Sequence, residues 1–176
     1  TVATYVFGLY IDEVLTMRRD AIPLGGPEDY YYHTDDLYNV MAMTDASAAV
    51  VERYEYQDYG APSFFTAAGT PIAQSAFNNP LLFTGRRYDP ETDWYYFRTR
   101  YLDPVAGRFI SRDAIGIWGD YLNIGNGHLY AGCNPFTYID PSGREVYLGL
   151  RAFQGFKESL VDEKTGHVFL IVVIRD

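Results

Sequence analysis

Short stretches of alternating apolar and polar residues fill the first 111 positions of the chain, and Asp, Asn, Gly or Pro residues separate them. A period of two places successive side chains on opposite faces of a β-strand. Asp and Asn side chains bond to nearby backbone amides, while Gly and Pro supply turn conformations. The pattern therefore predicts antiparallel hairpins, with two strands in Thr4 to Thr16 that bend at Gly8, and further strands at 30–33, 40–44 and 50–56.

The pattern is less regular between residues 63 and 80, where small residues accumulate and a short helix is expected at Ile72 to Phe77. After this stretch the alternation returns. It predicts three more strands with turns between them, the strands at 83–88, 94–101 and 108–111 and the turns at 89–92 and 103–107.

Gly, Asn and Pro then dominate residues 113–143, which predicts a long looping segment anchored by bulky side chains. The tyrosine pattern ends at Gly143, and we expect a domain boundary there. Residues 145–153 alternate again. A final hairpin is expected from residues 159–161 and 167–174 across a turn at 162–166.

The chain also repeats itself. Arg87-Tyr88-Asp89-Pro90 recurs as Arg100-Tyr101-Leu102-Asp103-Pro104, and aromatic triplets beside Asp-containing turns occur at 30–32, 54–56 and 95–97. Such self-similarity indicates units that bury their faces only by stacking on neighbours. A stack of this kind has open ends, which must be capped, continued or paired with another chain.

Composition narrows the possible partners. The 17 Tyr and 11 Phe residues suit strands whose faces pack on another sheet. A net charge of -9 argues against nucleic acid and anionic membranes as partners, and no apolar run is long enough for a membrane span. The single cysteine, Cys133, excludes an internal disulfide and a multi-cysteine metal site. No signal peptide is recognisable in residues 1–16, which are already strand-like, so we expect a fragment of a longer protein.

Several motifs in a fixed order resemble the RHS repeat-associated core, and residues 30–59 resemble the YD repeats that precede that core. The matching motifs are residues 85–92, 95–98, 100–109, Asp113, 134–135 and 140–143. Many separate matches in the right order make a more specific signal than one short motif. The resemblance covers residues 30–143.

The resemblance implies an all-β fold, in which stacked antiparallel hairpins form part of a hollow cocoon and a loop-rich core plugs one end. It divides the chain into N-terminal strands and a linker at 1–29, YD-repeat hairpins at 30–111, a core plug at 112–143 and a variable C-terminal segment at 144–176. In this family the segment after the Asp-Pro-x-Gly motif is usually a toxin. The resemblance also implies a secreted or cell-surface protein.

Many family members cut their own chain after that motif, using residues that match Arg100, Asp113 and Asp140. The cut would fall between Arg144 and Glu145. Hydrolysis by two carboxylates needs one as a base for water and one, kept protonated, as an acid. Arg100 could hold one carboxylate ionised while burial keeps the other neutral.

The same residues also allow a structural interpretation, in which Asp140 forms an Asx turn with Pro141 and Asp113 caps a loop. The chain departs from the family pattern at several places. Asp113 is followed by Ala114 instead of Pro, and Arg144 stands where Leu is usual. The segment 119–129 is also longer than usual, Asp93 stands where Gly is common, and Cys133 replaces a common Asn.

The remaining candidate groups predict structure instead of chemistry. His33, His128 and His167 are scattered, and Asp35-Asp36 lacks calcium-loop spacing, so neither a metal nor a cofactor is expected. No spacing supports a Cys133–His167 nucleophile pair, and the thiol is expected to be buried or inert. Five arginines interleave with aromatic residues, which predicts cation–π stacking and Arg–Asp pairs: Arg86, Arg87, Arg98, Arg100 and Arg108.

Three functions follow from these patterns. The leading hypothesis is a structural segment of an RHS shell, which encloses or presents a C-terminal segment and has the remainder of the shell, or copies of itself, as partner. The second is an aspartyl self-protease that acts once. The third is an oligomer or filament subunit that assembles through open strand edges.

Overall fold

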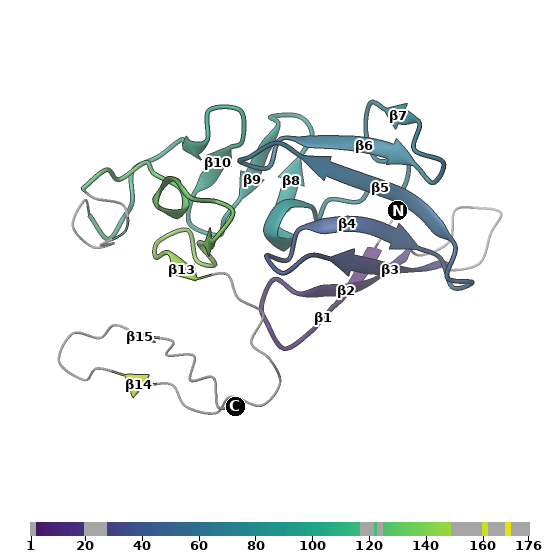
Figure 1. The fold of residues 1–176 in the computed structure, drawn as a ribbon, viewed down its shortest axis with the longest axis horizontal. Helices are drawn as coiled ribbons and strands as arrows, with labels where there is room; N and C mark the ends of the chain where they lie inside the picture. The colour runs from purple at the N-terminus through teal and green to yellow at the C-terminus, as the bar shows by residue number, and fades with distance from the viewer. Residues whose placement is uncertain are drawn as a thin grey trace, which may run out of the picture.

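The computed structural model describes residues 3–19, 28–116, 122, 125–148, 160–161 and 168–169. These residues form antiparallel strands and two single-turn 3-10 helices, so the predicted all-β class is confirmed. The strands form a seven-stranded sheet and a smaller four-stranded sheet. The two sheets lie side by side in Figure 1. No helix among the described residues is long and apolar enough to cross a membrane.

The large sheet is a meander, in which strands pair in the order of the sequence. Its strands are β1 (Ala3–Phe7), β2 (Val14–Arg19), β3 (Glu28–Thr34), β4 (Val40–Thr44), β5 (Val50–Tyr56), β6 (Pro62–Thr66) and β7 (Pro71–Ile72). The predicted N-terminal hairpin and the strands at 30–33, 40–44 and 50–56 are thereby confirmed. The strand β1 lies at one end of this sheet and the short β7 at the other.

Alternation decides which face of the large sheet is buried. Tyr30 and Tyr32 of β3 are buried, whereas Tyr31 between them is exposed. Across the sheet, Tyr32 pairs with Met43 of β4, which is also buried. Pairs of this kind on one face are the unit that stabilises a sheet. The tyrosine triplets therefore contribute to the core at every second position.

The turns after β3 and β4 use the predicted Asp chemistry. One carboxylate oxygen of Asp35 accepts bonds from the amides of Leu37 and Asn39, both at 2.9 Å. Asp45 accepts bonds from amides two and four positions ahead in the same way. These contacts satisfy backbone donors that a reversal of the chain leaves unpaired.

The small sheet contains β8 (Arg87–Asp89), β9 (Trp94–Tyr96), β10 (Tyr101–Asp103) and β11 (Arg108–Phe109). The single strand predicted at 94–101 is wrong, because the chain turns between β9 and β10. Arg98 has a φ of 63°, and the amide of Phe97 bonds to the carbonyl of Arg100 at 2.8 Å. The strand predicted at 83–88 begins instead with a 3-10 helix, η1 (Phe83–Gly85).

The helix predicted at Ile72 to Phe77 is also wrong. Residues after β7 form bends and turns, and a buried carboxylate of β5 holds them. Glu52 accepts bonds from the Ser75 hydroxyl at 2.6 Å and from the Ala76 amide at 2.7 Å. A side chain from a distant strand thus satisfies the donors that a local helix would otherwise pair.

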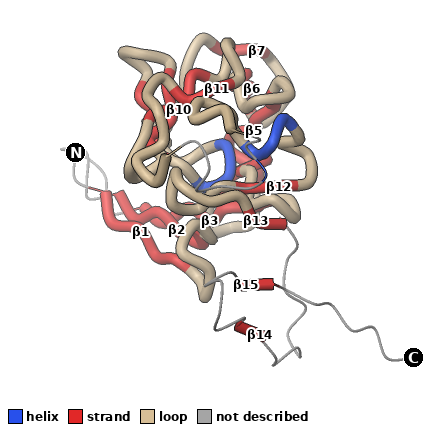
Figure 2. The backbone as a smooth tube through the Cα atoms, turned by 90° about the vertical axis from the view of Figure 1, so that its left-hand side faces the viewer, coloured by secondary structure: helices blue, strands red, loops and turns tan. Residues whose placement is uncertain are grey.

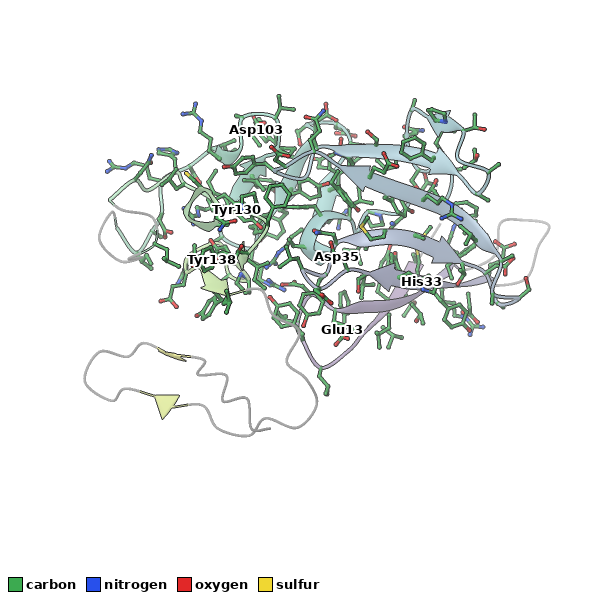
Figure 3. The ribbon with its side chains drawn as sticks, viewed as in Figure 1. Glu13, His33, Asp35, Asp103, Tyr130 and Tyr138 are labelled. Carbon is green, nitrogen blue, oxygen red and sulfur yellow. The ribbon has the colours of Figure 1, made fainter. Side chains whose placement is uncertain are left out.

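The two sheets meet over a common aromatic core. Tyr95 of β9 donates its hydroxyl to the carbonyl of Gly60 at 2.8 Å, and Val40 of β4 bonds through its amide to Leu82. Tyr130 is wholly buried and contacts Phe97 and Phe109 edge to face. Figure 3 shows Tyr130 on the side of the molecule that carries the small sheet.

The chain beyond β11 is mostly loop, as predicted, and Figure 2 shows it in tan. Within it lie η3 (Ala131–Cys133), β12 (Tyr138–Ile139) and β13 (Tyr147–Leu148), and the last two pair with each other. Near the C-terminus β14 (Leu160–Val161) pairs with β15 (Val168–Phe169), in agreement with the predicted hairpin. The turn expected at 162–166 and the alternation expected at 149–153 lie outside the described residues.

Candidate functional site

The first half of the Asp-Pro-Ser-Gly segment, residues 140–143, is held by two arginines. We refer to these four residues as the DPSG loop. Arg86 donates to the carbonyls of Asp140 (3.3 Å) and Pro141, and Arg98 donates to the carbonyl of Pro141 as well. Both arginines come from the turns around β8 and β9, so the small sheet fixes the position of the loop.

The second half of the loop is held by the two residues that follow Arg98. The Thr99 hydroxyl lies 2.9 Å from the carbonyl oxygen of Ser142 and 2.8 Å from that of Gly143. The Nε of Arg100 donates to the same Gly143 carbonyl at 2.6 Å. The turn between β9 and β10 places the side chains of Arg98, Thr99 and Arg100 together. The strand predicted at 94–101 is therefore wrong at the residues that build the site.

Arg100 joins the three residues that the sequence singled out. Its Nη2 lies 2.8 Å from Asp113 Oδ2 and 3.1 Å from Asp140 Oδ2, and all three side chains are buried. Its guanidinium lies 3.6 Å from the centre of the Phe109 ring, as the interleaved arginines predicted. The structure therefore brings Arg100, Asp113 and Asp140 to one point, where the DPSG loop ends.

The two carboxyl groups have different surroundings. Burial raises the pKa of Asp140 from its ordinary 3.8 to about 6, although Arg100 and the amides of Arg144 and Gly143 lower it. Asp113 accepts a bond from the Ile115 amide through Oδ1, while its buried Oδ2 faces Arg100 without an aligned hydrogen bond. A buried carboxyl that keeps its proton near neutral pH is suited to act as an acid.

These groups surround the peptide bond between Gly143 and Arg144. The carbonyl oxygen of that bond accepts from Thr99 and Arg100, and its amide donates to Asp140 Oδ1 at 2.9 Å. Donors aimed at a carbonyl oxygen stabilise the negative charge that develops there during acyl transfer. The arrangement thus provides an electrophilic clamp, a candidate acid and a second carboxylate.

Gly143 is required by the geometry of this site. Its φ is 71°, and a Cβ atom at this position would lie 2.3 Å from the carbonyl oxygen of Phe97. A residue with a side chain would therefore be strained in its backbone and would also push the loop away from the small sheet.

The structural interpretation of Asp140 is supported by the same contact. The bond from Asp140 to the amide four positions ahead repeats those of Asp35 to Asn39 and of Asp45 to Ala49. Asp140 is therefore a turn-forming residue as well as a buried carboxyl. What distinguishes it from the other two is the pair of cations, Arg86 and Arg100, around it.

Sequence reasoning missed Asp12. This residue lies in the turn between β1 and β2, and its carboxylate pairs with Arg86 at 2.8 Å and with Arg98 at 2.5 Å. The predicted Arg–Asp pairs are present, but one of the acidic partners is 86 positions away from its arginine. No local pattern identifies a partner at that separation.

The other candidate groups are placed elsewhere. Cys133 is exposed, so the expectation of a buried thiol is wrong; the tight turn at η3 points it outward from the core. His128 contacts the carbonyl of Phe109 and His33 contacts the Thr44 hydroxyl. Among the described residues no three His, Cys, Asp or Glu side chains gather in a way that could hold a metal. His167 lies outside the described side chains.

Solved structures of toxin complexes share this fold. The TcdB2-TccC3-TEV structure superposes on 80% of the chain with a TM-score of 0.63 and 19% identity, and the match spans 6% of that longer chain. A structural match at this level of sequence identity establishes the fold alone. The chain and that structure thus share an all-β fold.

Sequence comparison reaches the same class of protein. The chain is 34% identical over 132 residues to the tRNA3(Ser)-specific nuclease WapA of Bacillus spizizenii, and 32% identical over 120 residues to the toxin protein Tse5 of Pseudomonas aeruginosa. These matches cover 72% and 68% of the chain but 5% and 8% of the two relatives. No family model matches. The chain belongs to the RHS repeat-associated proteins and is an RHS segment of the kind found in polymorphic toxins.

Proposed function

We propose that this chain forms part of the wall and the closing end of an RHS shell. The shell encloses or presents the segment that follows Gly143. The meander of β1 to β7 supplies part of the wall. The plug of residues 112–143, together with the small sheet that holds its DPSG loop, closes the end. The toxin relatives support a secreted or cell-surface protein, and they support a toxin as the class of segment that begins at residue 144.

The observation that carries the shell proposal is the apolar edge of the large sheet. The edge strand β1 and the turn that follows it expose large apolar side chains, Leu9 almost completely at 96%. The exposed set is Val6, Phe7, Leu9 and Ile11, and Leu15 at the start of β2 is exposed beside them. An exposed, apolar strand edge pairs readily with another strand. Preceding repeats of the same shell would both continue the hydrogen-bond ladder and cover these side chains.

Sedimentation velocity over a range of concentrations tests this proposal. The chain alone is expected to self-associate through β1, and a Phe7→Arg, Leu9→Arg variant is expected to stay monomeric. An added stretch of YD repeats ahead of Thr1 is expected to suppress association in the same way. If the added repeats leave association unchanged, assembly of copies into oligomers or filaments becomes the better account, and a wild-type chain that is monomeric at all concentrations contradicts both.

A second function is supported by the contacts around Gly143, and we propose that the core hydrolyses its own backbone there once. In this step Asp113 takes a proton from water as the oxygen attacks the carbonyl carbon of Gly143. Thr99 and Arg100 stabilise the resulting oxyanion. As the C–N bond breaks, protonated Asp140 transfers its proton to the nitrogen of Arg144, so one carboxyl gains a proton and the other loses one.

Intact mass spectrometry tests this second function and locates the cut. The family pattern puts the cut between Arg144 and Glu145, whereas the clamp described above acts on the bond before Arg144. The N-terminal fragment would therefore end at Arg144 in the first case and at Gly143 in the second. Asp113→Asn is expected to leave one uncut chain. A wild-type chain that stays in one piece contradicts self-cleavage for this sequence.

A further inference from the structure

The turn between β1 and β2 is seated against the plug. Asp12 in this turn is 3% exposed, and a Cβ atom on Gly85 would lie 2.0 Å from the backbone oxygen of Asp12. In the same turn Tyr10 stacks on Tyr38 with ring centres 4.3 Å apart. The first hairpin of the wall therefore fits closely against the residues that lead into the small sheet.

Asp12 lies where two cations converge. Arg86 and Arg98 both donate to the carbonyl of Pro141. Arg86 also pairs with Oδ2 of the Asp12 carboxylate, and Arg98 donates to both of its oxygens. Burial lowers the pKa of Arg86, and the charge of Arg98 lowers it further, while Asp12 is the strongest influence that raises it. Without the Asp12 carboxylate, two guanidinium groups would face each other with little compensation.

Loss of the Asp12 carboxylate would affect the DPSG loop through those two arginines. Arg86 and Arg98 hold the carbonyls of Asp140 and Pro141, which precede the carbonyl of Gly143 in the clamp. A loss of alignment at Pro141 shifts Gly143 relative to Thr99 and Arg100. Small displacements of a reacting bond cost large factors in rate.

We propose that Asp12 is a positioning residue, which makes alignment of the DPSG loop depend on docking of the β1–β2 hairpin. This inference rests on the proposed self-cleavage. Asp12 touches neither the bond to be cut nor the groups that act on it. Self-cleavage then waits until the wall has folded against the plug, so that the segment after Gly143 is released only inside a completed end of the shell.

The test compares Asp12→Asn with Asp29→Asn in the full chain. Asp29 also pairs with an arginine, Arg18, but both side chains of that pair are largely exposed, so it is the matched control. Asp12→Asn is expected to slow self-cleavage on the order of tenfold or more, and Asp29→Asn to leave the rate unchanged. Asp12→Glu, which keeps the carboxylate, is expected to recover part of the rate.

Hydrogen exchange of the Arg144 amide, with each variant made in the uncut Asp113→Asn background, supplies a readout that does not need cleavage. In Asp12→Asn this amide is expected to exchange faster while the amides of β4 and β5 are unchanged, which a general loss of stability would not produce. If Asp12→Asn unfolds the chain, Arg98→Gln, which removes the partly exposed partner, is expected to show the same selective change.

The outcomes separate the two proposals. A cut wild type whose Asp12→Asn variant is cut equally fast overturns the role of Asp12 and leaves self-cleavage standing. An uncut wild type overturns self-cleavage, and the Arg144 amide then still reports whether Asp12 aligns the loop. Equal exchange at Arg144 in Asp12→Asn and Asp29→Asn overturns the role of Asp12 in either case.

Discussion

The guanidinium of Arg100 lies 3.1 Å from a carboxylate oxygen of Asp140, and both side chains are almost completely buried. Despite this cation, the pKa of Asp140 is raised, because burial outweighs the attraction. The same Nη2 atom also serves Asp113. One atom of Arg100 thus contacts two buried carboxyl groups.

Removal of that cation is expected to destabilise the fold. Arg100→Met leaves Asp113 and Asp140 without their shared partner and should lower the free energy of unfolding by about 3–5 kcal/mol. Arg87→Met, on the exposed side of β8, is the control and should change it little. Urea denaturation measures both, and equal effects would contradict a buried charge cluster.

The pH dependence of stability should show the raised pKa of Asp140. The folded chain keeps this proton up to a pH of about 6, whereas an unfolded Asp loses it near 3.8. The contribution of Asp140 to the free energy of unfolding is therefore complete below pH 3.8 and is lost as the pH rises through 6. It amounts to about 3 kcal/mol in all. Because other carboxylates add their own slopes, the difference between wild type and Asp140→Asn is the quantity to measure. If that difference is the same at pH 4 and pH 7, the pKa of Asp140 is not raised.

The rate of self-cleavage should depend on the protonation of Asp140. An acid with a pKa of about 6 is protonated in a falling fraction of molecules above that pH, so the rate is expected to decrease as the pH rises through 6. Single-turnover cleavage followed by gel electrophoresis from pH 5 to pH 8 measures this. A rate that increases over the range would remove Asp140 from the role of acid.

Two glycines with similar backbones separate conformational strain from crowding. Gly143 and Gly69 both have positive φ, 71° and 82°, but a Cβ would meet Phe97 at the first and open space at the second. Gly69→Ala should cost about 1 kcal/mol of stability. Gly143→Ala should cost more and should also abolish cleavage. Thermal unfolding of the two variants checks the order, and a smaller cost at Gly143 would contradict the packing of the DPSG loop.

The buried carboxylate of Glu52 should matter far more than its neighbour on the same strand. Glu52→Ala leaves the Ser75 hydroxyl, the Tyr54 hydroxyl and the Ala76 amide without their acceptor, so about 3 kcal/mol or more of stability should be lost. Glu55→Ala, on the exposed face of β5, is the control. Similar midpoints in urea would show that the network does not hold the segment after β7.

The sequence predicted those parts of the fold in which local chemistry decides. The strands at 40–44 and 50–56 agree with the structure because alternation and the Asp35 and Asp45 turns act within a few residues. The helix expected at 72–77 failed because Glu52, a distant side chain, takes the donors of Ser75 and Ala76. The sequence did not predict the turn between β9 and β10, because the contacts that hold this turn are made by the distant DPSG loop.

The site was found only through resemblance to the RHS core. The motifs singled out Arg100, Asp113 and Asp140, and the structure brings them together. Their catalytic role and the boundary at Gly143 stay predictions. Asp12 carried no motif, and its contacts with Arg86 and Arg98 depend on how the first hairpin packs against the plug.

The claim that this segment continues a larger shell is tested most directly at the free edge of β1. In a tandem chain, residues 28–66 are repeated ahead of Thr1, so that extra YD strands can follow the meander and pair with Ala3–Phe7. Hydrogen exchange of the β1 amides is then compared with that of the single chain at a concentration where it is monomeric. Exchange slowed on the order of tenfold or more in β1 is the predicted result. Unchanged exchange in β1 would contradict the account.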